Sequence, residues 1–339
     1  MIILIILFIL VGFIALFYGA KLTVISLENI AERLGVSHIL IGLTILAIGT
    51  SLPEIAVSII GGVDKLMGIS EDIDGIVIGN KIGSFFTQVT LILGILGMSK
   101  AIFVSKWELK REGSMMFISV IIFLLCALDG IITRLESILM IIAYILYLLV
   151  VIKSEKKRRR TEEEIKRFIA KRDGLDILED KKKAFVPFSY KKSITLFTIG
   201  LVILLIGAEI TILSAIELAK ELNIPGLLIG IFIIGLGTSI PELAADLTAL
   251  KRKDDGIAVG DILGSNICDI LLATASGSII AEFSVPLVIL YFDIPMLLIA
   301  IALLYYFLWS DNTLKKWEAM FLISFYGFYA LLKILFFQI

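Results

Sequence analysis

Long apolar runs separated by short polar segments follow one another along most of this 339-residue chain. A run of about 20 apolar residues is long enough to cross a bilayer as a helix. The first run lacks a basic leading segment and a small-residue cleavage site, which favours a retained span over a signal peptide. The predicted spans are residues 1–18, 38–62, 75–97, 115–131, 136–153, 194–215, 225–249, 256–280, 285–308 and 316–336. The pattern predicts an all-α polytopic membrane protein with ten transmembrane helices.

Composition agrees with this prediction and narrows the chemistry. Hydrophobic residues make up 59% of the chain and the mean hydropathy is +1.02, above the range of soluble globular proteins. We therefore expect a multi-pass protein of the cell membrane, in contact with lipids and with no nucleic-acid partner. Cys126 and Cys268 both lie in apolar spans, which argues against a disulfide framework and a Cys-rich metal site. The single histidine, His38, lies near the start of a span and does not support a zinc site.

The distribution of basic residues predicts the orientation. If both termini face outward, the inner loops hold 26 Lys and Arg residues. Three basic residues then lie in outer loops (Lys65, Arg134 and Lys220) and two lie within spans (Lys81 and Lys333). Since basic residues concentrate on the cytoplasmic side, the chain is expected to be N-out and C-out.

A basic segment at residues 154–192, which begins with SEKKRRR, divides the chain into regions 1–153 and 193–339. It is interpreted as a solvated cytoplasmic connector with one short helix. The alternative is a regulatory arm that binds anionic lipids, since basic residues near the cytoplasmic leaflet gain about 1 kcal/mol each from the surface potential.

The two regions contain copies of one motif, GTSLPE at 49–54 and GTSIPE at 237–242. Aligning Gly19–Glu54 with Gly207–Glu242 gives 15 identities in 36 positions at a constant offset of 188. Because each copy belongs to a set of five predicted spans, an odd number, the two sets must have opposite orientations. The sequence therefore predicts two inverted-topology five-helix repeats with a site near the midplane, which is a transporter architecture.

A second pair of segments extends the match, with residues 76–94 corresponding to 257–275 at an offset of 181. Within each segment, two polar positions lie four residues apart and so face the same side of a helix. The alignment equates Asn80 with Asp261, Ser84 with Ser265, and Gln88 with Asp269. Polar stripes from both repeats are therefore expected to face inward.

The repeated motif has the chemistry of a cation site. Pro53 and Pro241 lack an N–H, so each is expected to break its helix and free the carbonyl of Gly49 or Gly237. Broken backbone at membrane depth is tolerated where it lines a hydrated cavity or meets a ligand. The motif side chains are hard oxygen ligands, suited to Ca2+ and Na+. They are Thr50, Ser51, Glu54, Thr238, Ser239 and Glu242.

On these paired GTS[LI]PE and G-[ND]-x-x-G-S motifs the chain resembles the cation/calcium exchanger superfamily, in particular its prokaryotic sodium/calcium exchanger branch. The motif regions would be the alpha-1 repeat at 42–97 and the alpha-2 repeat at 230–277. The resemblance implies ten helices, of which helices 1 and 6 slide as a pair against an eight-helix core. It also implies antiport of Na+ against Ca2+ by alternating access, without a cofactor or enzymatic activity.

The resemblance further implies the ligands. Ca2+ would be held by Glu54 and Glu242 with the backbone carbonyls of Thr50 and Thr238. Na+ would use the same glutamates together with four serine hydroxyls and two carbonyls, and positions 88 and 269 would flank the centre. The serines are Ser51, Ser84, Ser239 and Ser265, the carbonyls are those of Ala47 and Gly235, and the flanking residues are Gln88 and Asp269.

The chain departs from the family pattern at several positions. Gln88 replaces the usual Asn or Asp, and Lys81 places a cation in a span that should bind cations. Lys81 either snorkels to the interface, as lysines near span ends do, or reaches the site, where Asp261 is a candidate partner. Asp246 and Asp261 are additional acids of the second repeat and are treated as modulators of the site.

These charges bear on coupling. Ionised Glu54, Glu242 and Asp269 carry three negative charges, which three Na+ would neutralise and one Ca2+ would not. Electrogenic exchange is the default expectation. If Lys81 reaches the site, coupling would fall toward two Na+ or involve H+.

Three alternatives remain open from the sequence. A Ca2+/H+ or other divalent cation exchanger would use carboxylates that titrate when desolvated. An intramembrane enzyme would use the glutamates as an acid/base pair, although catalysis does not need inverted symmetry. A passive channel is the third, and saturable counterflow would separate it from an exchanger. No ATP-binding motif is present, and a monomer is expected.

Overall fold

The computed structural model describes residues 2–33, 47–104, 106–173, 189–251 and 255–337, and the chain is mostly helical. His38 and the other residues outside these ranges are not described, so the predictions made for them stay predictions. In the element names, η denotes a π-helical segment. Up to the connector the elements are α1 (Ile2–Arg33), α3 (Ala47–Thr50), α4 (Leu52–Leu66), α5 (Ile73–Phe86), η2 (Thr87–Ile92), α6 (Leu93–Ser99), β1 (Ile102–Phe103), α7 (Lys106–Glu108), η3 (Leu109–Gly113), α8 (Ser114–Cys126), β2 (Ile131–Ile132) and α9 (Arg134–Asp173).

The second region has a similar order of elements. Its elements are α10 (Tyr190–Leu222), α11 (Gly226–Ile229), η4 (Gly230–Ile234), α12 (Gly235–Thr238), α13 (Ile240–Lys251), α14 (Asp255–Cys268), η5 (Asp269–Ala273), α15 (Thr274–Ser278), β3 (Phe283–Ser284), η6 (Ile289–Asp293), α16 (Ile294–Asp311), β4 (Thr313–Leu314) and α17 (Lys316–Phe337).

Eight helices in the described part of the chain are long and apolar enough to cross a membrane. They correspond to eight of the ten predicted spans. Of the other two, the span predicted at 38–62 begins outside the described residues, and the one at 115–131 corresponds to α8, which has 13 residues. The chain is thus a multi-pass membrane protein.

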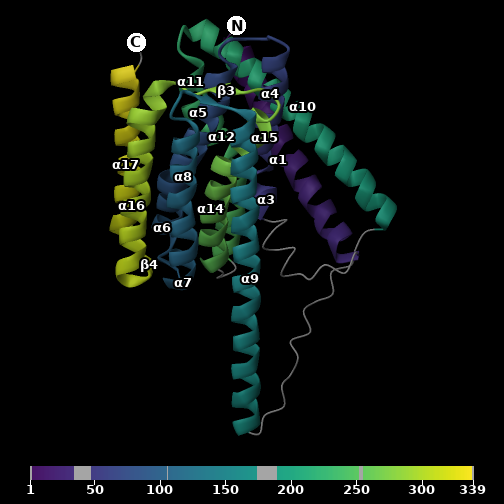
Figure 1. The fold of residues 1–339 in the computed structure, drawn as a ribbon, viewed down its shortest axis with the longest axis vertical. Coiled ribbons are helices and arrows are strands. Elements are labelled where there is room, and N and C mark those ends of the chain that lie inside the picture. Colours follow the sequence, from purple (N-terminus) through teal and green to yellow (C-terminus); the bar gives the residue numbers. More distant parts are fainter. Residues whose placement is uncertain (1, 34–46, 105, 174–188, 252–254, 338–339) are drawn as a thin grey trace.

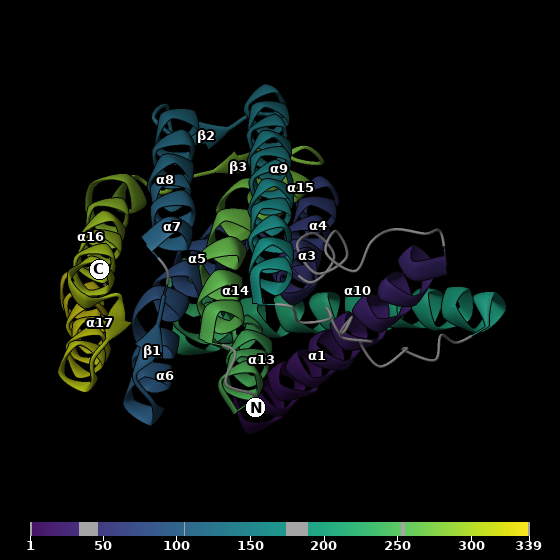
Figure 2. The same cartoon turned by 90° about the horizontal axis from the view of Figure 1, so that it is seen from below.

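Helices α1 and α10 pack against each other along their length and cross the rest of the bundle obliquely (Figure 1). The remaining long helices stand roughly side by side, as the view from below also shows (Figure 2). α1 and α10 hold the first predicted spans of the two regions. The pair α1 and α10 therefore differs in direction from the bundle that contains both copies of the motif.

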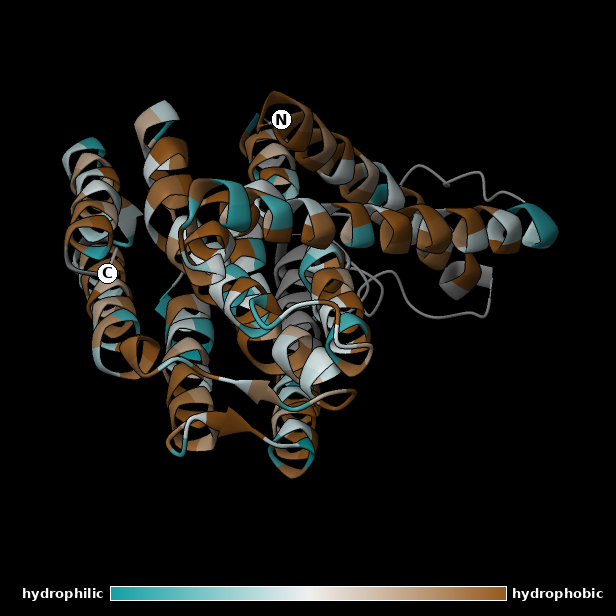
Figure 3. Cartoon of the chain, turned by 90° about the horizontal axis from the view of Figure 1, so that it is seen from above, coloured by the Kyte–Doolittle hydropathy of each residue, from teal (hydrophilic) through white to brown (hydrophobic). Residues whose placement is uncertain are grey.

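Hydrophobic residues make up much of the length of the helices (Figure 3). On α1, Ile3 is 85% exposed and Leu4 is 55% exposed, while Leu16 is buried. Large apolar side chains facing outward are costly in water and favourable against lipid tails. The exposed surface of the bundle is therefore suited to a bilayer.

Two short antiparallel ribbons correct the all-α prediction. β1 pairs with β4, with Ile102 opposite Leu314, and β2 pairs with β3, with Ile131 opposite Ser284. β3 and β4 lie at opposite ends of the bundle (Figure 1). Strands of two residues are too short to leave an alternating pattern, so sequence reasoning missed them. Each ribbon joins a loop of the first region to a loop of the second.

The basic connector begins as a continuation of the last helix of the first region. α9 runs from Arg134 to Asp173 without a break at residue 153, and it extends well beyond the bundle (Figure 1). The predicted connector therefore starts as a helix that is continuous with the preceding span, and α10 begins at Tyr190.

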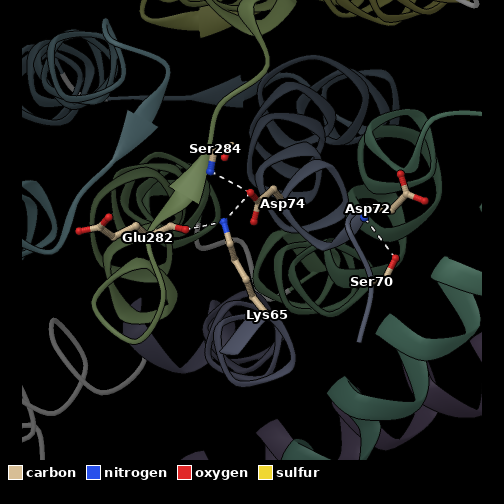
Figure 4. Close-up of polar contacts among 6 residues, drawn as sticks. All are labelled: Lys65, Ser70, Asp72, Asp74, Glu282 and Ser284. Atoms are coloured by element: carbon tan, nitrogen blue, oxygen red, sulfur yellow. Dashed lines mark hydrogen bonds and ion pairs between the residues drawn. The ribbon is translucent and has the colours of Figure 1, made fainter. Parts of the chain in front are cut away.

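A polar network lies where α4 ends, α5 begins and β3 passes (Figure 4). Lys65 Nζ lies 2.6 Å from Asp74 Oδ2 and donates to the Glu282 carbonyl, also at 2.6 Å. The Ser284 backbone N–H donates to the same Asp74 oxygen at 2.9 Å. This network, which we call the end network, links the two regions at one end of the bundle.

Candidate cation-binding centre

Both copies of the motif interrupt their helix at the same residue, as their prolines predict. α3 ends at Thr50 and α4 begins at Leu52, while α12 ends at Thr238 and α13 begins at Ile240. The serines between them, Ser51 and Ser239, have nearly identical backbone angles (φ −82°, ψ 6° and φ −87°, ψ 0°). These values lie in the sparsely populated bridge region, where functional residues are often found.

The first region brings α5 unusually close to the second copy of the motif. A Cβ placed on Gly83 would lie 2.1 Å from the Ile231 carbonyl oxygen, and one on Gly235 would lie 2.6 Å from the Ser84 backbone nitrogen. Only glycine allows the two backbones to approach this closely. The approach places Ser84, next to Gly83, against the broken helix of the second motif.

The Ser84 hydroxyl is the hub of the centre. It lies 3.2 Å from Glu54 Oε1, 2.8 Å from Ser239 Oγ and 3.4 Å from Asp269 Oδ2. Gln88 Nε2 donates to Ser84 Oγ at 3.1 Å and to Asp269 Oδ2 at 3.3 Å. All five side chains are buried. Because a hydroxyl has one proton, Ser84 can donate to only one of its three possible acceptors at a time.

The carboxylates of the centre are therefore short of donors. Among the described residues, no hydrogen-bond donor reaches Glu54 Oε2, Asp269 Oδ1 or either oxygen of Glu242. Glu242 is fully buried and within electrostatic range of both Glu54 and Asp269. A buried carboxylate without donors costs several kcal/mol unless it is neutralised. These oxygens, with the likewise unpaired Ser51 Oγ, are suited to hold a cation.

Carboxylates alone do not complete a cation shell. In the described ranges, no group of three acidic, His or Cys side chains is placed to hold a metal ion. A shell of hard oxygens must therefore draw on hydroxyl, amide and carbonyl groups as well, as Ca2+ and Na+ sites commonly do. Ser51, Ser84, Ser239 and Gln88 offer such groups beside the carboxylates.

The motif threonines make equivalent contacts across the two regions. Thr50 Oγ1 donates to Asp261 Oδ1 at 3.2 Å and lies 3.1 Å from Ser265 Oγ. Thr238 Oγ1 lies 3.0 Å from Asn80 Oδ1, the residue that the alignment equates with Asp261. The sequence alignment pairs positions 80 and 261 but does not predict Asn80 as a residue of the site. In the structure, both positions contact a motif threonine of the other region.

The positions of Gln88 and Asp269 coincide with π-helical segments. η2 includes Gln88, and η5 begins at Asp269. Thr274, the first residue of α15, donates its hydroxyl to the Asp269 carbonyl, five residues back, at 3.1 Å. Single-turn π segments inside α-helices often mark functional sites. Neither segment was predicted, since periodicity does not distinguish one wide turn from a regular helix.

Lys81 does not snorkel, contrary to one of the two sequence interpretations. Its side chain is fully buried, and Nζ donates to the Glu54 backbone carbonyl at 2.5 Å. The pair with Asp261 is also not formed among the described residues: Lys81 Nζ contacts the Glu54 carbonyl, and Asp261 Oδ1 accepts from Thr50. α5 begins at Ile73, so Lys81 lies eight residues, or about 12 Å, inside the helix. That depth is too great for the ammonium group to reach the interface at the start of α5.

Three other predicted positions lie at the margin of this cluster. The Gly235 carbonyl accepts from the Ser239 hydroxyl at 2.8 Å, and the Gly237 carbonyl receives the Ser239 backbone N–H. Asp246 is buried with no donor to either oxygen in the described part, and it senses the charge of Asp261. Ala47 is the first residue of α3, and its side chain lies outside the described set.

Comparison with known proteins agrees with this geometry. The family profile for the sodium/calcium exchanger protein matches residues 4–153 and 192–335. The chain is 30% identical to the sodium/calcium exchanger MaX1 of Methanosarcina acetivorans, over 94% of this chain and 95% of that protein. An uncharacterized membrane protein of Methanocaldococcus jannaschii is 32% identical over 94% of each chain.

A solved structure gives the same result. The sodium-calcium exchanger NCX_Mj, in a crystal soaked with Na+ and Sr2+, superposes with a TM-score of 0.62 at 30% identity, and the match covers 100% of both chains. The profile match excludes only the ends and the basic connector. The chain belongs to the sodium/calcium exchanger family.

Proposed function

We propose that this protein is a secondary antiporter of the cell membrane that exchanges Na+ for Ca2+ at one centre built from both motif copies. The observation that carries the proposal is the set of donor-less carboxylate oxygens on Glu54, Glu242 and Asp269. They belong to both repeats and are buried, Glu54 and Glu242 just after the two helix breaks and Asp269 at the start of η5. The names of the related exchangers supply the ion pair.

The shared carboxylates account for exchange. Ca2+ and Na+ favour similar oxygen ligands, so either ion can neutralise the same group of carboxylates. Without an ion, the apolar sliding helices would have to cover the ionised centre while its charge is uncompensated, which is costly. Occupied states are therefore the ones that change access. Movement of one ion type in one direction becomes linked to movement of the other in reverse.

We further propose ten transmembrane helices in two inverted repeats, with both termini outside. The two ribbons support this arrangement, because β1 and β3 occupy equivalent places in the two repeats and so do β2 and β4. The equivalent threonine contacts support it independently. In this arrangement α1 and α10 form the pair that slides across the bundle, and the segment at 154–192 is cytoplasmic.

Within the centre, we assign Ca2+ to Glu54 and Glu242 and place Na+ on the same glutamates with the motif serines. Ser84 and Ser239 already lie 2.8 Å apart, so their hydroxyls can turn to a bound ion from both sides. Gln88 holds Asp269 Oδ2 and leaves Asp269 Oδ1 for the ion. Thr50 and Thr238 would contribute carbonyls, while their hydroxyls stay bonded to Asp261 and Asn80.

Uptake of 45Ca2+ into proteoliposomes tests the exchange. Vesicles loaded with Na+, K+ or an acidic buffer are diluted into medium without that gradient partner. We expect uptake only with outward-directed Na+, and loss of uptake in Glu54→Gln and Glu242→Gln. Uptake that follows a pH gradient and ignores Na+ would replace this proposal with Ca2+/H+ exchange. Uptake that survives both substitutions would refute the site.

A further inference from the structure

The ammonium group of Lys81 belongs to the cation centre. Lys81 Nζ lies 2.5 Å from the carbonyl oxygen of Glu54, the residue whose carboxylate contacts Ser84. Its side chain has no exposed surface. The carboxylates of Glu54 and Asp269 are both within electrostatic range of the ammonium. Lys81 thus has the two surroundings that a bound monovalent cation would have, a carbonyl ligand and nearby carboxylates.

The other buried lysine in a span has a different environment. Lys333 Nζ lies 2.5 Å from Asp293 Oδ2, and the Tyr329 hydroxyl donates to the second oxygen of that carboxylate at 2.7 Å. That lysine and Asp293 neutralise each other as a closed ion pair. For Lys81, no carboxylate oxygen of the described residues lies within the 4.0 Å of an ion pair, and its acceptor is a backbone carbonyl. Its charge is therefore shared by the centre instead of cancelled by one partner.

We propose that Lys81 acts as a built-in monovalent cation of the transport site and sets the coupling at two Na+ for each Ca2+. This inference rests on the proposed Na+/Ca2+ exchange. Glu54, Glu242 and Asp269 contribute three negative charges, and the Lys81 ammonium leaves a net charge of two. One Ca2+ or two Na+ neutralises that remainder, so the centre carries no net charge in either half of the cycle when its access changes.

The position of Lys81 in the repeat supports this role. The alignment that equates Asn80 with Asp261 places Ile262 opposite Lys81. A buried isoleucine at the equivalent position shows that the fold itself does not need a charge there. The first repeat therefore carries the counter-charge, while the second repeat carries the additional acids Asp261 and Asp269.

Voltage dependence separates two-to-one from three-to-one coupling. The purified protein is placed in proteoliposomes with a fixed Na+ gradient, and the membrane potential is clamped with K+ and valinomycin. One charge crossing 60 mV changes a concentration ratio about tenfold, so three-to-one coupling shifts the final 45Ca2+ ratio by about that factor. We expect no shift for the wild type. A tenfold shift in the wild type would overturn the inference.

Variants test whether Lys81 is the cause. Lys81→Met keeps the length without the charge and is expected to add one Na+, together with the tenfold voltage shift. Lys81→Arg keeps the charge and should remain voltage-independent. Lys220→Met removes an exposed lysine 3.9 Å from Glu217 and serves as a matched control, with coupling unchanged. If Lys81→Met transports Ca2+ without gaining voltage dependence, Lys81 does not set the coupling.

Equilibrium binding covers a variant that folds without transporting. Na+ displacement of 45Ca2+ from purified protein should be steeper by one Na+ in Lys81→Met than in the wild type. Equal steepness would overturn the inference. Failure of the proposed function has a different signature, because the wild type would then take up no Ca2+ in response to Na+. Na+-driven uptake with three-to-one coupling would leave the exchange intact and remove only the role of Lys81.

Discussion

The two copies of the motif have nearly the same backbone conformation but differ in their electrostatic surroundings. In the first copy, Glu54 has Ser84 beside one oxygen and Lys81 on its carbonyl. In the second, Glu242 has no donor to either oxygen within the described residues. The difference teaches that the inverted repeat fixes where ligands lie, while substitutions at equivalent positions decide which of them remain free for an ion.

Glutamine at the two glutamates should produce the largest effects and separate the copies. Both Glu242→Gln and Glu54→Gln should weaken Ca2+ binding about 100-fold, since losing one partner of a buried charge pair costs about 3 kcal/mol. Without ions, however, Glu242→Gln should raise thermal stability because it removes an uncompensated buried charge. Glu54→Gln should change it less. Thermal unfolding in Na+-free and Ca2+-free buffer checks this, and equal shifts would mean that the two carboxylates have equivalent surroundings.

Alanine at equivalent glycines should separate the copies in packing. Gly83→Ala would place a Cβ 2.1 Å from the Ile231 carbonyl, and forcing the backbones apart should cost about 2 kcal/mol of stability. At the equivalent Gly264, the nearest described atom is Tyr147 Oη at 3.8 Å, so Gly264→Ala should be tolerated. Gly327→Ala, with nothing described within 4 Å, serves as a control. Equal losses of folded protein for Gly83→Ala and Gly264→Ala would contradict the close approach of α5 and η4.

Replacing Asn80 with aspartate and Asp261 with asparagine should give smaller effects, of opposite sign. Asp261→Asn makes the second copy resemble the first, and Asn80→Asp does the reverse. Neither residue is assigned as a Ca2+ ligand, so each acts through charge at a distance, worth about 1 kcal/mol or about fivefold in affinity. Binding of 45Ca2+ should weaken in Asp261→Asn and strengthen in Asn80→Asp. Changes in the same direction would mean that the threonine contacts matter more than the charge.

The end network should contribute least to the stability of the protein. Lys65 and Asp74 form a partly exposed ion pair, with side chains 31% and 16% exposed, whereas the centre is buried. Asp74→Asn should therefore cost about 0.5–1 kcal/mol of stability, and the loss should shrink in 1 M KCl because salt screens exposed charges. Lys220→Met gives a matched surface control. A loss above 2 kcal/mol that is independent of salt would show that this network supports the fold as strongly as the buried contacts do.

Sequence reasoning predicted much of this architecture because the repeat is present in the residues themselves. The prolines predicted the helix breaks at Ser51 and Ser239, and the four-residue spacing predicted that Ser84 and Gln88 share one side of a helix. Such features depend on local backbone chemistry. They can be predicted without knowing how the helices pack.

The direction of Lys81 could not be predicted in the same way. Its depth depends on where α5 begins, and two residues of uncertainty in that boundary decide between snorkelling and burial. The contact of Asn80 with Thr238 depends on how closely α5 and α12 approach, which Gly83 and Gly235 permit without specifying the partner. Such contacts between the repeats become visible only once the helices are placed.

The central claim is that both motif copies bind the same ion, and equilibrium 45Ca2+ binding to purified protein tests it most directly. The wild type should bind one Ca2+ per chain, displaced by Na+. Glu54→Gln and Glu242→Gln should each remove high-affinity binding, and the double variant should lose little more than either one, because both side chains act on one ion. Two Ca2+ per chain in the wild type, with one retained in each single variant, would contradict a shared site.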